Sequence, residues 1–118
     1  MRQPRIFTAS FFAPDDHKPG TVFSIANSQP RGFGLPKLDF FRPGYLLGEY
    51  KSGAIDWPRY EWLYKYGLRC DYMLVETWVA ELTGDITLCC WEADPETCHR
   101  KWAAEYLRSA LGCEVMVR

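Results

Sequence analysis

The chain lacks several features that would place it in a large class of proteins. No apolar run approaches the roughly 18 residues that cross a bilayer, and the first residues do not form an apolar signal region. There is no G-x-x-x-x-G-K-[ST] phosphate loop, no G-x-G-x-x-G loop, no nucleophile elbow and no Cys-x-x-Cys pair. We therefore expect a cytoplasmic protein without a membrane partner and outside the common nucleotide-loop enzymes.

A strong net charge is also lacking. The 14 Lys and Arg residues are balanced by 15 Asp and Glu residues, so the formal charge is -1 at pH 7 and no global field attracts nucleic acid. The length of 118 residues suffices for one domain and is too short for two ordinary ones. We expect residues 1–118 to form a single domain whose many aromatic side chains, 16% of the sequence, serve mainly the core.

The five cysteines are an odd number in a chain without an export signal, so a disulfide framework is not expected. Cys89 and Cys90 are adjacent in a predicted strand, where neighbouring side chains point to opposite faces. Cys90 shares a face with Leu88 and Glu92 near the end of that strand. We therefore expect Cys90, rather than Cys89, to face the helix that follows.

Apolar periodicity predicts an α/β fold. Short apolar runs bounded by turn residues predict strands over residues 5–12, 21–26, 86–91 and 113–117. Helical spacing of apolar residues predicts helices over residues 45–51, 56–68, 71–82 and 98–111. Asp56 suits the N-cap of the second of these helices, and Gly112 suits the C-terminal end of the last. The order of elements predicts a small three-layer α/β domain with a mostly parallel central sheet of about four strands.

The junction between strand 86–91 and helix 98–111 carries the most polar chemistry. Backbone N–H groups at a helix start lack partners, and the helix dipole adds positive charge there, so such a site suits anions. Arg100 could add a bidentate donor, and the pKa of the Cys98 thiol would fall beside the helix start. His99 could act as an acid, a base or a donor.

These residues define our first hypothesis, a binding or catalytic site for a small anionic or nucleotide-like ligand. The catalytic candidates are Cys98, His99 and Arg100. Strand ends and the adjoining loop supply the candidate ligand-binding residues, which are Cys90, Glu92, Ser10, Ser24 and Arg31. A structural alternative exists at each position: Cys98 could be a small core residue, His99 a cap, and Arg100 a partner of Glu96.

A thiol-dependent or zinc-dependent protein is a second alternative. Cys90, Cys98 and His99 are residue types that zinc accepts, but adjacent Cys98 and His99 at a helix start diverge by roughly 100 degrees, which disfavours shared coordination. We assign no metal or other cofactor on this evidence. A phosphatase cradle is rejected, because Cys98 and Arg100 are too close in sequence to enclose a loop of backbone N–H groups.

The long segment 27–51 offers a third alternative. Its first part, residues 27–44, is rich in proline and glycine and longer than most structureless loops. Basic residues alternate with aromatic ones along it, namely Arg31, Lys37, Arg42 and Lys51 with Phe33, Phe40, Phe41, Tyr45 and Tyr50. This composition suits a nucleic-acid-associated module, or else a solvated loop that core aromatics hold in place.

The junction resembles the signature of the family named domain of unknown function 488. The matching residues run from Leu88 to Arg100 and continue as Ala103-Ala104-Glu105-Tyr106-Leu107. Looser similarity covers Ser10-Phe11-Phe12, the segment 24–31, and the spaced residues Leu47, Tyr50, Lys51, Gly53 and Ile55. Longer members often have Asp-Val-Arg where this chain has Ser24-Ile25-Ala26. The resemblance implies a Rossmann-like α/β fold and a polar site at Cys98-His99-Arg100, and it implies no particular reaction.

Overall fold

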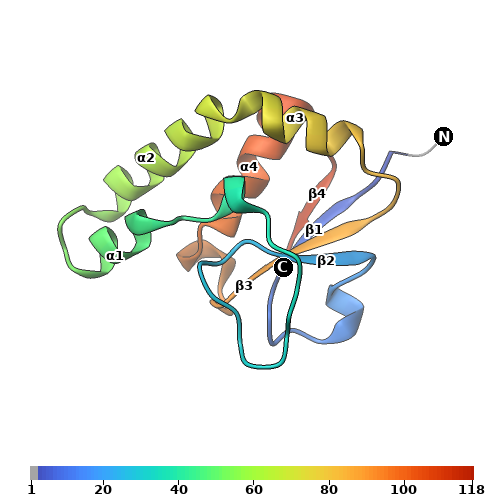
Figure 1. Ribbon diagram of the computed structural model, residues 1–118, viewed down its shortest axis with the longest axis horizontal. Helices are drawn as coiled ribbons and strands as arrows, with labels where there is room; N and C mark the ends of the chain where they lie inside the picture. The colour runs from blue at the N-terminus through green and yellow to red at the C-terminus, as the bar shows by residue number, and fades with distance from the viewer. Residues whose placement is uncertain (1–2) are drawn as a thin grey trace.

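The computed structural model describes residues 3–118 and shows four strands beside a curved arc of helices (Figure 1). The elements in chain order are β1 (Ile6–Ser10), η1 (Asp15–His17), β2 (Thr21–Ser24), η2 (Asp39–Phe41), α1 (Tyr45–Lys51), α2 (Trp57–Cys70), α3 (Tyr72–Ala80), β3 (Ile86–Cys90), η3 (Pro95–Thr97), α4 (Arg100–Leu111) and β4 (Val115–Val117). The η elements are single 3-10 turns. No helix in this described range is both long and apolar enough to cross a bilayer.

The central sheet is entirely parallel, in the strand order β2-β3-β1-β4. This confirms the predicted α/β domain around a four-stranded sheet, which is Rossmann-like. β1 pairs with β3 from Ile6↔Ile86 to Ser10↔Cys90, and β2 pairs with β3 as far as Ser24↔Cys89. The carboxyl ends of three neighbouring strands, with Ser10, Ser24 and Cys90, therefore lie along one edge of the sheet.

The two faces of the sheet are covered unequally. On the face of Cys90, α4 packs against β1 and β3, and α2 packs on α4. On the opposite face, the Thr87 hydroxyl donates to the Pro19 carbonyl at 2.8 Å, so the short connection between β1 and β2 lies there. The predicted three layers are thus one layer of α-helices, the sheet, and a thin cover that contains η1 (Figure 1).

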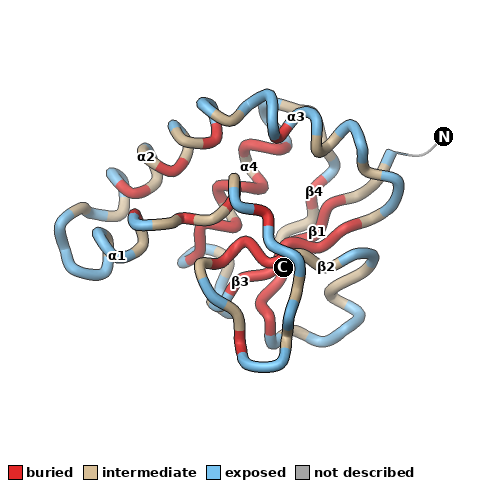
Figure 2. The backbone as a smooth tube through the Cα atoms, viewed as in Figure 1, coloured by how far each residue is buried: buried red, intermediate tan, exposed pale blue. Residues whose placement is uncertain are grey.

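The core lies between the sheet and α4 (Figure 2). Every residue of β1 and β3 is buried, so both strands are covered on both faces of the sheet. Aromatic side chains fill the space between α2 and α4: the ring centroids of Tyr60 and Trp102 are 4.9 Å apart, in an edge-to-face contact. The Tyr64 hydroxyl donates to the buried Phe41 carbonyl at 2.7 Å, which ties η2 to α2.

Helix ends follow the predicted caps in two cases. The Asp56 carboxylate accepts a hydrogen bond from the Arg59 N–H at 2.9 Å and caps α2. Gly112 ends α4 with φ of 66°, a left-handed conformation that favours glycine. The helical spacing that predicts helices 71–82 and 98–111 counts Leu74 and Ala110 as core-facing, and both of these assignments are wrong: Leu74 on α3 is 61% exposed, and Ala110 on α4 is exposed. Both lie outside the contact area because α3 buries only Val75 fully and the last turn of α4 extends beyond the core.

The loop of residues 27–44 is held in place by its own polar side chains and by aromatics. The Asn27 side chain donates to the Gly44 carbonyl at 2.8 Å and accepts from the Gly44 N–H at 2.9 Å, which closes the ends of the loop. The Gln29 side chain makes a similar pair of bonds to Leu35. Phe33 packs edge-to-face on Phe11. The expectation that aromatic residues tie this loop to the core is confirmed.

Gly20, immediately before β2, is required by close contact as well as by its backbone conformation. Its φ is 75°, and a Cβ atom there would lie 1.7 Å from the Asp85 carbonyl oxygen. Gly32 has a φ of 88°, but a Cβ atom there would have no neighbour within 4 Å, so Gly32→Ala is a matched control for the backbone effect alone.

We expect Gly20→Ala to lower the free energy of unfolding by more than about 3 kcal/mol, and Gly32→Ala by about 1–2 kcal/mol.

Urea denaturation of both variants measures the difference. Equal losses of stability in the two variants would show that the close approach of Gly20 to Asp85 does not constrain the chain.

Candidate functional site

The connection between β3 and α4 is a short turn with its own hydrogen bonds. The Asp94 carboxylate accepts from the Glu96 N–H at 2.9 Å, and the Thr97 hydroxyl donates to the Asp94 carbonyl at 3.0 Å. Pro95 opens the 3-10 turn η3, and Cys98 after it is extended. The strand therefore ends at Cys90, one residue before the predicted end at 91, and α4 begins at Arg100 rather than at 98.

Cys90 and Cys98 meet in the interior. Both are buried, and they are joined as a disulfide across eight residues of sequence. The prediction that Cys90 faces the helix is confirmed. The sequence predicted no disulfide framework and did not anticipate this single bond, which forms because the η3 turn folds Cys98 back onto the end of β3. Cys89 points to the opposite face as a free thiol, and burial raises its pKa to about 11.

Arg100 is fully buried, and its donors serve the backbone of the junction. Nη1 donates to the Glu92 carbonyl at 2.5 Å, and Nη2 donates to the carbonyls of Ala93 at 3.0 Å and Arg118 at 3.2 Å. Nη1 also lies 2.9 Å from the Cys90 Sγ atom, and Nε has no partner within residues 3–118. Burial is the main cause that lowers the pKa of Arg100, and the Glu92 carboxylate partly offsets it. The guanidinium thus joins the end of β3, the turn and the residue after β4.

His99 links the junction to the end of β2. Its Nε2 atom donates to the Ile25 carbonyl at 2.6 Å, because a carbonyl can only accept. The pKa of His99 is lowered to about 4, mainly by burial. The hydrogen bond to Ile25 raises this pKa, and the nearby charge of Arg100 lowers it further. The imidazole is therefore neutral at pH 7, with the Nδ1 lone pair 3.7 Å from the Cys98 Sγ atom. His99 is the N-cap residue of α4 but makes no side-chain capping bond.

A cavity of about 370 Å³ lies beside this junction, between the residues that follow β2, the helix α1 and the residues that follow β3. Its lining residues are Ala26, Asn27, Ser28, Pro43, Leu47, Lys51, Trp91, Glu92 and His99. Two predicted site residues, Glu92 and His99, are thus brought together in one cavity. The Trp91 ring is 41% exposed, and its Nε1 atom donates to the Ser28 carbonyl at 2.9 Å, which fixes the ring at the rim.

The remaining candidates lie elsewhere. Ser10 accepts from the Phe12 N–H at 3.2 Å and lines a separate hollow with His17. Ser24 is fully buried, and its hydroxyl accepts from the Ala26 N–H at 3.3 Å. Arg31 is exposed and does not line the cavity. Ser10 and Ser24 therefore lie at the predicted edge of the sheet, but these two serines and Arg31 do not share one site.

Lys51 and Trp91 belong to the cavity but were not among the predicted site residues. Lys51 ends α1, far from the junction in sequence, and reaches the cavity because the Asn27–Gly44 bonds fold α1 back over the end of β2. Two sequence signals include Lys51: the spaced motif of the family resemblance and the basic-aromatic segment 27–51. Trp91 lies inside the signature itself, but its place at the end of an apolar run predicts a strand residue and gives no sign of a cavity.

The basic and aromatic segment 27–51 does not form a stripe of exposed rings. Phe41 is buried, and Phe40 packs against it with 4.8 Å between ring centroids. Arg42 pairs with Asp39 at 3.1 Å. Most of the aromatic side chains that could stack on bases are instead part of the core, and Tyr45 is the exposed exception.

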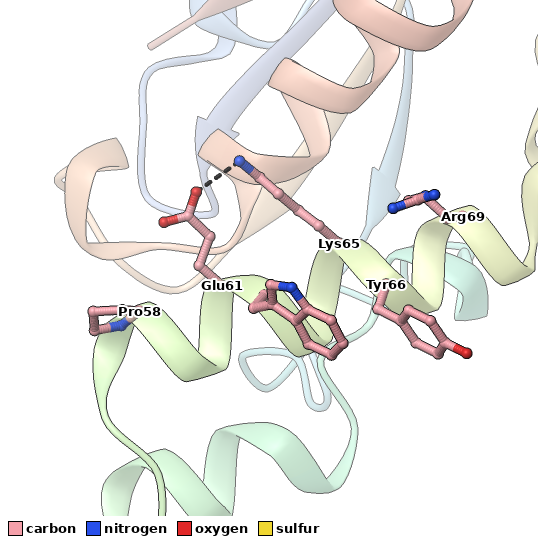
Figure 3. A pocket seen from close by; sticks show the side chains of 6 residues that line it. Pro58, Glu61, Lys65, Tyr66 and Arg69 are labelled. Atoms are coloured by element: carbon pink, nitrogen blue, oxygen red, sulfur yellow. Dashed lines mark hydrogen bonds and ion pairs between the residues drawn. The ribbon is translucent and has the colours of Figure 1, made fainter.

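A second hollow of similar size lies on the outer side of α2, far from this chemistry. Figure 3 shows its lining side chains along one helix, with Glu61 and Lys65 joined as an ion pair at 2.6 Å. The rings of Trp62 and Tyr66 stack there with centroids 5.4 Å apart. These contacts are ordinary surface pairs at helical spacing, so we place the candidate site at the β3–α4 junction.

Comparison with known proteins adds no assignment. No protein-family model matches the chain, and neither the curated proteins nor the solved structures contain a significant match.

The neutral, buried state of His99 predicts a pH-dependent stability. The pKa is about 4 in the folded chain and about 6.5 when unfolded, so the stabilisation is complete above pH 6.5 and is lost as the pH falls toward 4. We expect the free energy of unfolding to fall by about 2 kcal/mol between pH 7 and pH 5 on account of this group. Urea denaturation at both pH values measures the change.

His99→Gln is the control, because its amide can still donate to the Ile25 carbonyl but does not titrate. The other ionisable groups contribute equally to the two proteins, so the difference between their pH dependences belongs to His99. The same pH dependence in both proteins would contradict the prediction.

Proposed function

We propose that the cavity at the β3–α4 junction binds a small anionic, nucleotide-like molecule. The proposal rests on the position of the cavity and on its lining. The cavity has a volume of about 370 Å³, is lined by Lys51, Glu92 and Trp91 among others, and lies at the edge of the sheet where the parallel strands end. Open parallel sheets bind ligands outside the carboxyl ends of their strands, and small-molecule cavities have volumes of this order.

The lining divides by chemistry into three parts. Pro43, Leu47 and the Trp91 ring supply an apolar surface that suits the face of a base or another flat ring. Glu92 supplies a carboxylate that accepts hydrogen bonds from amino or hydroxyl groups. Lys51 is the cation of the lining and suits a phosphate or carboxylate.

The charge of the cavity favours a ligand with one anionic group. Because His99 is neutral at pH 7, it adds polarity without charge. Arg100 faces backbone carbonyls and does not line the cavity, so we assign it a positioning role instead of ligand contact. Lys51 and Glu92 then leave the lining without net charge, an arrangement suited to a monophosphate better than to a triphosphate.

The similarity to the family named domain of unknown function 488 fits this proposal, and we propose the chain as a short, divergent member. Support comes from the signature residues that lie in contact: Cys90 with Cys98, and Arg100 with Cys90. The rest of the signature helix, including Ala103 and Leu107, is buried against the core.

Calorimetry with adenosine monophosphate, adenosine and inorganic phosphate tests the site. We expect Lys51→Gln to weaken binding of the monophosphate by about tenfold, the loss of one charge-assisted contact, and to leave adenosine binding unchanged. Lys37→Gln is the matched control, because Lys37 is an exposed lysine outside the cavity. Equal affinity of wild type and Lys51→Gln for the monophosphate, or no binding of it to the wild type, would refute the assignment.

A further inference from the structure

A compact group of potential metal ligands lies beneath the cavity. The Sγ atoms of Cys90 and Cys98 and a carboxylate oxygen of Glu92 all lie within 4.8 Å of one another. Both cysteines are buried, and Glu92 also lines the cavity. Two sulfurs and a carboxylate oxygen are ligands that zinc accepts, and thiolates favour zinc over the hard cations.

The distance between the backbones of Cys90 and Cys98 suits a metal ion held between the two sulfurs as well as a disulfide bond. Their Cα atoms are 7.6 Å apart, whereas most disulfides span about 4.4–6.8 Å. An ion held between two sulfurs fits a wider separation of the backbones, because each zinc–sulfur bond adds about 2.3 Å.

Arg100 provides an independent observation that points to an anionic centre here. Its guanidinium is 0% exposed, and it has no ion pair among residues 3–118. Nη1 points at the Cys90 sulfur from 2.9 Å. A buried charge is costly unless an opposite charge compensates it. A neutral disulfide places no charge on the Cys90 sulfur, whereas a zinc-bound thiolate would place negative charge directly opposite Nη1. The Glu92 carboxylate contributes one negative charge to the cluster in both states, because the divalent ion and the two thiolates cancel.

We propose that the reduced protein binds one zinc ion through Cys90, Cys98 and Glu92, with Arg100 as the positioning residue that donates to the Cys90 thiolate. Reduction of the disulfide by a thiol reductant consumes two electrons and two protons and yields two thiols. Zinc binding then releases the two thiol protons to solvent. Three protein ligands leave a fourth position for water or for a ligand in the cavity that Glu92 lines.

The test uses the full chain, reduced and freed of metal, with zinc alone titrated against a chromophoric chelator. We expect one equivalent bound per chain, about 100-fold weaker binding in Cys98→Ser, and about tenfold weaker binding in Glu92→Gln. Cys70→Ser is the matched control, because Cys70 is an exposed free cysteine outside the cluster and should not affect binding. Cobalt in place of zinc should give a sulfur-to-cobalt charge-transfer band that Cys98→Ser loses.

Two measurements do not depend on the folding of a cysteine variant. Wild-type protein whose disulfide has been formed with oxidised glutathione should bind no zinc, and Glu92→Gln changes only a half-buried side chain. Absence of a stoichiometric site in the reduced wild type, absence of the cobalt–sulfur band, or full zinc affinity in Glu92→Gln or in the oxidised protein would each overturn the proposal. The small-ligand proposal is tested through Lys51, which is not a metal ligand, so the two can fail separately.

Discussion

The burial of one guanidinium is the constraint around which the carboxyl edge of the sheet is built. Arg100 has no access to water, so only the protein can satisfy its donors, and both Nη atoms find acceptors among residues 3–118 whereas Nε does not. Its hydrogen bonds are accepted by carbonyls of the turn after β3, by the carbonyl of the residue after β4, and by the Cys90 sulfur. Loss of the side chain would leave the carbonyls of Glu92, Ala93 and Arg118 without this donor. The turn, the strand end and the last strand therefore depend on the same residue.

A second link extends this arrangement from β3 to β2. The parallel sheet already places the ends of the two strands side by side, and the His99–Ile25 hydrogen bond fixes the residues that follow them. The Asn27 side chain then holds Gly44 and so carries α1 to the same place. These hydrogen bonds fix the backbone segments around the cavity, so the shape of the cavity depends on the backbone as well as on the side chains that line it.

The sequence was sufficient for the architecture and for placing Glu92 and His99 at one junction, but not for the other walls of the cavity beside it. Alternation along β3 correctly oriented Cys90, and the caps at Asp56 and Gly112 were visible as local chemistry. The start of α4 was misplaced because Asp94 and Pro95 form a separate turn, which helical periodicity does not reveal. Lys51 could not be placed by any local rule, because its position depends on a bond between residues that lie 17 apart in sequence.

Glu92 connects the two proposed sites, and its carboxylate determines how they would influence each other. With the disulfide formed, the carboxylate is free to accept hydrogen bonds from a molecule in the cavity. As a zinc ligand, the same carboxylate would face the ion and could no longer do so. A molecule that donates to Glu92 would then bind less tightly to the zinc form than to the oxidised form, and by reciprocity it would weaken zinc binding. The redox state of Cys90 and Cys98 would thus control the affinity of a cavity that neither cysteine lines.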